Sequence, residues 1–332
     1  MQKILNNNKP TTDLENDFKS NWNLIFVTII ITILIIIVTI TAYLFKNHSE
    51  KQIINSETSI SLKFIKFQNL PTLEFGHYTL WFVDGSKQFH LIKRFNVKSD
   101  KLISLDGTNL QSLSINSLSD IQQAVITIEQ EGDRNEVPNT IIFLTSNYQL
   151  DNDMKFTLND QLPELNKTEI SFQLQTPTDQ NTQINEQSGI WFVATSANIL
   201  PVITTTGWSY QARLIYKAVY DLNIGYFNDL NNKDNSSRFS LAIDNPPNYP
   251  GEDFLTNLPD ELFGPLNLTN GNSKVIISIE PMQDDLDPTG SKLFLPILEA
   301  TIAEKTEIHV NYPMQNIYQP PELVIKTVHN SK

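Results

Sequence analysis

The chain has 332 residues, a formal net charge of −13 and no cysteine. An acidic chain without a cluster of Lys and Arg is not expected to bind nucleic acid or to dock on anionic lipid. The lack of cysteine excludes disulfides, thiolate metal sites and a cysteine nucleophile. A bias towards Ile, Asn and Lys without cysteine is typical of a bacterium with an AT-rich genome.

Residues 24–45 form the most distinctive segment of the chain. Leu24 to Phe45 reads LIFVTIIITILIIIVTITAYLF, with no charged residue in 22 positions. As a helix with ~1.5 Å of rise per residue it is about 33 Å long, enough to cross a hydrocarbon core of about 30 Å. A signal-peptide core has about 7–15 residues and precedes a small-x-small cleavage site, and neither condition is met. The sequence therefore predicts one uncleaved transmembrane helix that places the protein in the lipid bilayer.

The orientation of this helix is not determined by charge. Residues 1–23 hold three lysines and three acidic residues, and the 20 residues after the helix also hold three lysines. The positive-inside rule thus favours neither orientation by its count of lysines. The positive charge of the amino terminus slightly favours a tail on the inside. We expect a cytoplasmic tail (1–23) and an extracytoplasmic body that follows a polar stalk (46–58) in the cell membrane.

The body shows strand signals and no helical period of ten residues or more. Alternating, aromatic and β-branched runs predict strands at Ile60–Phe67, Tyr78–Val83, Phe89–Val97, Ala124–Glu129 and Thr140–Leu144. Asp84-Gly85 predicts the turn of a hairpin. One face of the third strand would carry Leu91, Lys93, Phe95 and Val97, so its register is uncertain.

Turn residues at intervals of roughly 8–15 residues indicate an all-β chain built as two tandem antiparallel β-sandwich (Ig-like) domains. We expect domain 1 at 59–147, a connector at 148–187, domain 2 at 188–312 and an extended C-terminal tail at 313–332. The two domains should each enclose an apolar core of their own.

An internal repeat supports this division. The matches, in order, are Leu70-Pro71 with Leu200-Pro201, Gly76-His-Tyr78 with Gly207-Trp-Ser-Tyr210, Ala124–Glu129 with Val275–Glu280, Pro138 with Pro288, and Ile142-Phe-Leu144 with Leu293-Phe-Leu295. The second copy is longer by 21 residues between its Pro and its Glu, which fits an insertion within 231–270. That segment is rich in Asn, Pro and Gly, so we expect a loop outside the second sandwich whose shortening at Asn231–Ser237 costs little. Ile126 and Ile277 should occupy equivalent strands and be buried.

The repeated motif resembles the extracytoplasmic C-terminal domain of anti-sigma-K factors. The resemblance rests on Leu70-Pro71-x-Leu73, on Gly76-x-Tyr78-x-Leu80-Trp81-x-Val83-Asp84-Gly85, and on Val125-x-Ile-x-Ile-Glu129. The second copy keeps Ile279-Glu280-Pro281 and Pro288-Thr289-Gly290. The resemblance implies two diverged copies of a small β-sandwich that one transmembrane helix places outside the cell. The 23 residues before that helix are too few to hold a sigma factor, so sigma-factor inhibition is not implied.

Candidate chemical residues are few. The five histidines (His48, His77, His90, His309 and His329) have no partner at metal-ligand spacing and are expected at the surface or on edge strands. Asp284-Asp285-x-Asp287 lacks the alternate spacing of a calcium loop and is interpreted as a solvated turn. No nucleotide-binding, Ser-hydrolase or zinc-protease motif occurs. The sequence thus predicts no catalytic residue, no metal and no cofactor.

Two sets of recurring residues invite a structural interpretation. Glu129 and Glu280 end equivalent predicted strands, and this repetition favours bonds to a turn's backbone amides over a catalytic pair. Trp81, Trp191 and Trp208 lie in or beside strands, where core packing is expected rather than a ligand platform.

We expect a membrane-tethered interaction or regulatory module at the cell envelope that contacts an unidentified envelope protein. A structural cell-surface protein is the alternative. An enzyme whose site is assembled from loops is a further alternative, which clustered buried carboxylates in a pocket would favour.

Overall fold

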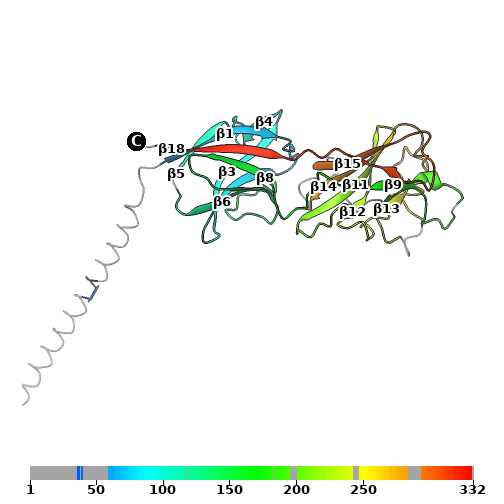
Figure 1. Ribbon diagram of the computed structural model, residues 1–332, viewed down its shortest axis with the longest axis horizontal. Helices are drawn as coiled ribbons and strands as arrows, with labels where there is room; N and C mark the ends of the chain where they lie inside the picture. Colours follow the sequence, from blue (N-terminus) through cyan, green and yellow to red (C-terminus); the bar gives the residue numbers. More distant parts are fainter. Residues whose placement is uncertain are drawn as a thin grey trace, which may run out of the picture. The chain divides into compact units, whose positions relative to one another are not determined.

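The computed structural model describes residues 36–37, 39, 59–116, 118–181, 183–194, 200–241, 247–282 and 293–330. Over the described part of 59–330 the chain is all-β, with antiparallel sheets and one 3-10 turn, η1 (Glu186–Ser188) (Figure 1). The prediction of an all-β antiparallel fold is confirmed. Ile36, Ile37 and Thr39 are helical, and the rest of the predicted transmembrane segment lies outside the described residues. Among the residues that are described, no helix has the length and apolar character needed to cross a membrane.

The first half of the body contributes most of a nine-stranded sheet with the order β4-β3-β2-β6-β7-β8-β18-β1-β5. Its strands are β1 (Ser59–Gln68), β2 (His77–Asp84), β3 (Phe89–Lys98), β4 (Lys101–Ser104), β5 (Ser112–Asn116), β6 (Ile121–Glu129), β7 (Ile142–Asn147), β8 (Asp153–Leu158) and β18 (Glu322–Asn330). The five strands predicted between Ile60 and Leu144 correspond to β1, β2, β3, β6 and β7. The Asp84-Gly85 turn joins β2 to β3 as a hairpin.

The second half forms two smaller sheets. The four-stranded sheet has the order β13-β10-β9-β16, and the five-stranded sheet has the order β12-β11-β14-β15-β17. Their strands are β9 (Ser171–Leu174), β10 (Gly189–Val193), β11 (Trp208–Tyr216), β12 (Tyr220–Phe227), β13 (Gly251–Asp253), β14 (Ser273–Pro281), β15 (Leu295–Ile302), β16 (Tyr312–Pro313) and β17 (Gln315–Asn316).

A β-bulge resolves the uncertain register of β3. The pairing of β2 with β3 shifts between Leu80 and Trp81, so that Leu80 faces Lys93 whereas Trp81 faces Leu91. A bulge inserts one residue and thereby moves the following side chains to the other face. Leu91 accordingly packs with Trp81, while Phe95 belongs to the main core.

The repeat predicted from the sequence has a structural counterpart in the strands. Tyr78 of β2 lies opposite Ile128 of β6, and Tyr210 of β11 lies opposite Ile279 of β14. The hydroxyl of Tyr78 donates to the carbonyl of Pro71 at 2.8 Å. The hydroxyl of Tyr210 donates to the carbonyl of Pro201, also at 2.8 Å. Ile126 and Ile277 are both 0% exposed in equivalent strands, as predicted.

The irregularities of the two sheets also correspond. The bulge between Leu80 and Trp81 has its equivalent in the pairing of β11 with β12, where the register shifts between Ala212 and Arg213. The pairings of β6 with β7 and of β14 with β15 shift directly after Ile126 and Ile277. Leu144 therefore corresponds to Leu298, three residues further on than the sequence match suggested, because the segment before β15 is longer.

The apolar core is continuous through both halves. Buried residues of every sheet form one contiguous cluster. The ring of Phe143 in the first half lies 6.1 Å from that of Trp208 and 5.0 Å from that of Phe294 in the second. The expectation of two separate apolar cores is therefore not met, and residues from Ser59 to Asn330 form one compact unit.

The C-terminal strand revises the expected boundaries. The sequence predicts an extended tail at 313–332, but Glu322–Asn330 forms β18 between β8 and β1 in the nine-stranded sheet. Figure 1 shows β18, in red, beside β1, in blue. Leu323 and Ile325 are fully buried and alternate with less buried neighbours, which is the pattern of a strand with one face on the core.

The prediction that the insertion lies outside the second half is wrong. Within 231–270 the chain forms β13, which pairs with β10. Phe239, Phe254, Leu266 and Leu268 are at most 3% exposed and belong to the main core. These apolar residues are spaced along a sequence rich in turn residues, and they anchor the segment to the sheet. The composition of the segment did not predict this packing.

Candidate functional site: a pocket in the insertion

The insertion, defined as residues 231–270, follows β12 and folds back against it. Asn235 donates its backbone N–H to the carbonyl of Tyr226 at 3.0 Å. Its side-chain oxygen Oδ1 accepts the backbone N–H of Tyr226 at 2.8 Å. These reciprocal bonds hold the first part of the insertion on the outer edge of the five-stranded sheet.

Asp234, the residue before Asn235, is a buried carboxylate at the centre of the site. Its Oδ1 accepts the backbone N–H of Ser236 at 2.9 Å, and its Oδ2 accepts the backbone N–H of Gly251 at 2.8 Å. Burial raises the pKa of Asp234 to about 6, because the charged form loses its hydration. A Cβ at Gly225 would collide with this carboxylate, so the missing side chain at that position makes room for it.

Two further carboxylates, Glu252 and Asp253, are 0% exposed on β13. Asp253 accepts the indole N–H of Trp191 at 2.7 Å and the backbone N–H of Thr178 at 2.9 Å. Burial raises the pKa of Asp253 to about 6. The carboxylate of Asp253 therefore fixes the orientation of the Trp191 indole.

The other carboxylate of β13 is held by serines of the insertion. Glu252 accepts a short hydrogen bond from the hydroxyl of Ser240 and a longer one, at 3.4 Å, from that of Ser236. Burial raises the pKa of Glu252 to about 7. All three carboxylates thus have hydrogen-bond donors, as buried polar groups need to: those of Asp234 and Glu252 lie within the insertion, and those of Asp253 lie outside it.

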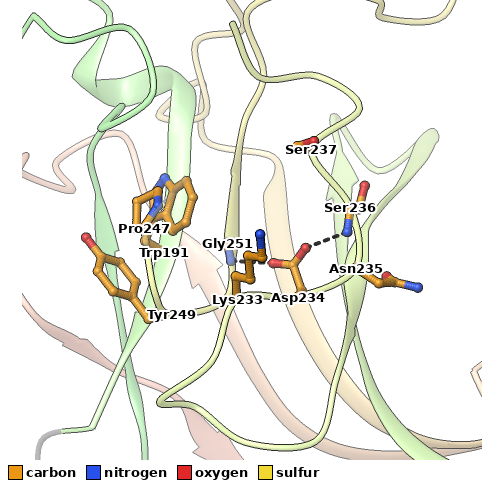
Figure 2. A pocket seen from close by; sticks show the side chains of 9 residues that line it. All are labelled: Trp191, Lys233, Asp234, Asn235, Ser236, Ser237, Pro247, Tyr249 and Gly251. Carbon is orange, nitrogen blue, oxygen red and sulfur yellow. Dashed lines mark hydrogen bonds between the residues drawn. The ribbon is translucent and has the colours of Figure 1, made fainter. Parts of the chain in front are cut away.

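Around Asp234 the surface is hollowed into a pocket of about 240 Å³ (Figure 2). Its lining consists of Trp191, Lys233, Asp234, Asn235, Ser236, Ser237, Pro247, Tyr249 and Gly251. In Figure 2 the two aromatic residues lie on one side of the pocket, and Asp234, Asn235 and Ser236 lie on the other. The pocket therefore has an aromatic wall and a polar wall.

The aromatic wall is built by two rings in edge-to-face contact. The ring centroids of Trp191 and Tyr249 are 5.3 Å apart with an angle of 79° between the ring planes. Gly251 faces Trp191 across the strand pair, and a Cβ there would lie 2.5 Å from an indole carbon. Gly251 is thus needed so that the indole can lie against the backbone of β13.

The structure confirms the interpretation of the two recurring glutamates. Glu129 accepts the backbone N–H of Asn139 at 3.2 Å, and Glu280 accepts that of Phe294 at 2.9 Å. Each carboxylate also accepts a short hydrogen bond from the hydroxyl two residues before it, which belongs to Thr127 or to Ser278. Both residues fasten the segment that leads to the next strand, and neither lines the pocket of the insertion.

The tryptophans are buried as expected. Trp81 is 0% exposed, and Trp191 and Trp208 are 2% exposed. Trp81 donates its indole N–H to the hydroxyl of Thr127 at 2.8 Å. Trp191 alone of the three also lines the pocket, a role that the sequence did not indicate.

The histidines are dispersed. His77 is 3% exposed, contrary to its predicted position at the surface or on an edge strand, because β2 is an inner strand between β3 and β6. His90 contacts Asp84 at 2.9 Å, and His309 contacts Glu186 at 3.3 Å. His48, the side chain of His329 and the Asp284–Asp287 turn lie outside the described residues. Within the part of the chain that is described, no three His, Asp or Glu side chains are placed to hold a metal ion.

Sequence reasoning missed Asp234, Glu252 and Asp253. The segment around them reads NNKDNSS and NPPNYPGEDF, which is typical of solvated loops. The pair Glu252-Asp253 between Gly251 and Phe254 carries no periodic signal. The burial of these acids depends on how the insertion packs and not on any local pattern.

In comparisons with known proteins, no protein-family model, no curated protein and no solved structure matches this chain.

Proposed function

We propose that the chain is a single-pass membrane protein of the cell envelope whose β body is an extracytoplasmic binding module, with the pocket of the insertion as its binding site. The uncharged 22-residue segment at 24–45 supports the anchor. The excess of acidic residues after this segment supports a solvent-exposed body. The resemblance to extracytoplasmic domains of anti-sigma-K factors supports the same order of parts, a helix followed by β-domains.

One observation carries the assignment of the site. The two halves share their central strands, their bulges and their Tyr-to-Pro hydrogen bonds, whereas the insertion is found in the second half alone. When a strand arrangement is present twice, a segment that only one copy has is not part of the common arrangement, although here it also packs against the core. The insertion builds a pocket with an aromatic wall and a polar wall, which is the usual composition of a binding site.

A hydrolase is the second candidate. A carboxylate whose pKa is raised by burial can act as a general acid, and Asp234 has this property and lines the pocket. Glycoside hydrolysis, for example, needs two carboxylates that flank the substrate. Among the described residues Asp234 alone contributes a carboxylate to the lining, so binding is the function that the pocket supports best.

Site-specific photocrosslinking in the living cell tests the binding function. A photoreactive residue is placed at Ser237, which lines the pocket, in the full-length chain. The matched control carries it at Val219, which is 75% exposed in the turn between β11 and β12. Irradiation should yield a discrete adduct with an envelope component from position 237 only. Equal adducts from both positions, or none from position 237, would contradict the proposal.

Protease accessibility tests the location. Protease added to cells with a permeabilised outer layer should digest the body and leave the residues before Leu24 intact. A body that survives until the membrane itself is lysed would refute the extracytoplasmic assignment.

A further inference from the structure

The charges in the pocket lining argue for a ligand without net charge. Lys233 and Asp234 contribute one positive and one negative side chain to the same lining. Glu252 lies just behind it, in contact with Ser236, and adds negative potential against an anionic ligand whenever it is ionised. The ammonium of Lys233, which lies between the aromatic rings and Asp234 in Figure 2, opposes a cation on those rings.

The two walls narrow the ligand class further. Tyr249 and Pro247 offer apolar surface, and the buried ring of Trp191 supports that of Tyr249 by its edge-to-face contact. The opposite wall offers hydrogen-bonding groups of both kinds, namely the ammonium of Lys233 as a donor and the remaining lone pairs of Asp234 as acceptors. A matching ligand therefore has one C–H face, which the negative face of an aromatic ring attracts, and an edge of donors and acceptors.

A pyranose ring has this combination, because its axial C–H groups form an apolar face while its hydroxyls form a polar rim. The size of the pocket agrees with one such ring. Its volume of about 240 Å³ lies below the range of roughly 300–1,000 Å³ that drug-sized ligands need.

We propose that the pocket binds a single neutral sugar unit, which stacks on Tyr249 and bonds through its hydroxyls to Lys233 and Asp234, while the buried Trp191 supports the Tyr249 ring from behind. This proposal rests on the proposed function, because it names the ligand class of the same pocket. In the cell envelope the sugar unit would belong to a glycan, so the chain would tether a glycan strand or a glycosylated partner to the membrane.

Saturation-transfer NMR on the full-length chain tests the sugar proposal. The protein is kept in a detergent without a sugar headgroup and is mixed with glucose, galactose, N-acetylglucosamine or short oligomers of these. We expect transfer to the C–H protons of at least one sugar. The affinity should fall about tenfold in Tyr249→Ala, equivalent to about 1.4 kcal/mol.

Lys233→Ala serves as the second variant, because Lys233 is exposed and its truncation does not endanger folding. It should weaken sugar binding, whereas Lys217→Ala, at an exposed lysine in the turn between β11 and β12, should leave it unchanged. Tetramethylammonium and acetate are tested in parallel as a cationic and an anionic probe.

The outcomes separate the two proposals. If no sugar binds while position 237 still forms its crosslink, the ligand class is wrong and the binding function stands. If tetramethylammonium or acetate binds in a Tyr249-dependent manner instead, the pocket is an ion site and the sugar proposal fails. If neither a sugar nor a crosslink is found, both proposals fail.

Discussion

At the scale of single residues, Asp234 shows how one carboxylate can organise a site. It ties Ser236 to Gly251 by two backbone hydrogen bonds, and so joins the beginning of the insertion to β13. Gly225 and Gly251 are small where the carboxylate and the Trp191 indole need space. The site therefore depends on Gly225, Asp234 and Gly251 together.

We predict that Asp234→Ala lowers the free energy of unfolding by about 1–3 kcal/mol, because it leaves two backbone N–H groups without their acceptor. Chemical denaturation of the full-length chain measures this loss. Asp260→Ala, at an exposed residue of the same insertion, is the control and should change stability by no more than about 0.5 kcal/mol. Equal effects of the two substitutions would show that Asp234 does not hold the insertion.

This residue also marks the limit of what the sequence reveals about the site. Glu129 and Glu280 could be assigned correctly because each follows a strongly apolar strand and the pattern occurs twice. Asp234 occurs once, in a segment whose composition is that of a solvated loop. Whether an acid is buried depends on tertiary contacts, and a single sequence does not contain them.

At the scale of secondary structure elements, the sequence predicted β2 and β6 but missed β18, β13 and the bulges. β2 and β6 are rich in aromatic and β-branched residues, and so they were recognised. β13 has three residues and follows Pro250, which gives no periodic signal. The bulges could not be predicted either, because in the sequence a bulge only interrupts the alternation of apolar and polar residues.

β13 gives rise to a prediction about pH. Glu252 and Asp253 on this strand and Asp234 beside it have pKa values of about 7, 6 and 6 in the folded chain, against ordinary values of 4.5, 3.8 and 3.8. Between the ordinary and the raised pKa values of these carboxyl groups, the folded chain binds more protons than the unfolded chain. The free energy of unfolding therefore falls as pH rises through this range. The contribution is fully present below about pH 4 and is lost as pH increases through 6 and 7.

The melting temperature should therefore be higher at pH 5.5 than at pH 8. Burial also raises the pKa of Glu129, whereas burial lowers the pKa of His77, which acts in the opposite direction in this pH range. Hydrogen bonds lower the pKa of Asp84 and Asp106, which act at more acidic pH. Glu252→Gln should reduce the difference, and Glu261→Gln, at an exposed residue of the insertion, should not. A melting temperature that rises from pH 5.5 to pH 8 would rule out this account of the three carboxylates.

At the scale of the whole molecule, two copies of one strand arrangement share a single core. The repeat in the sequence predicted the equivalent strands, but it also suggested two independent domains. The return of β18 to the first sheet and the contacts of Phe143 with Trp208 and Phe294 join the halves instead. Sequence similarity between copies reports their common strands, and it contains no information on how the copies pack together.

We predict that Ile126→Ala and Ile277→Ala each cost about 2–5 kcal/mol, because both side chains are fully buried in the continuous core. Both substitutions should shift the same single unfolding transition of the body in differential scanning calorimetry. Val137→Ala, at a residue that is 72% exposed, is the control and should have little effect. Two resolved transitions, each shifted by one substitution only, would instead show that the halves unfold independently.

The central claim is that the insertion, and not the repeated framework, is the surface through which the chain binds an envelope component. Hydrogen-exchange mass spectrometry of the full-length chain, with and without envelope fragments, tests this claim most directly. The account predicts slower exchange in peptides that cover Asn231 to Phe254 and unchanged exchange in the hairpin of β2 and β3, the first-half counterpart of the strands before the insertion. Protection of β2 and β3, or of the edge strand β5, with no change in the insertion would contradict it.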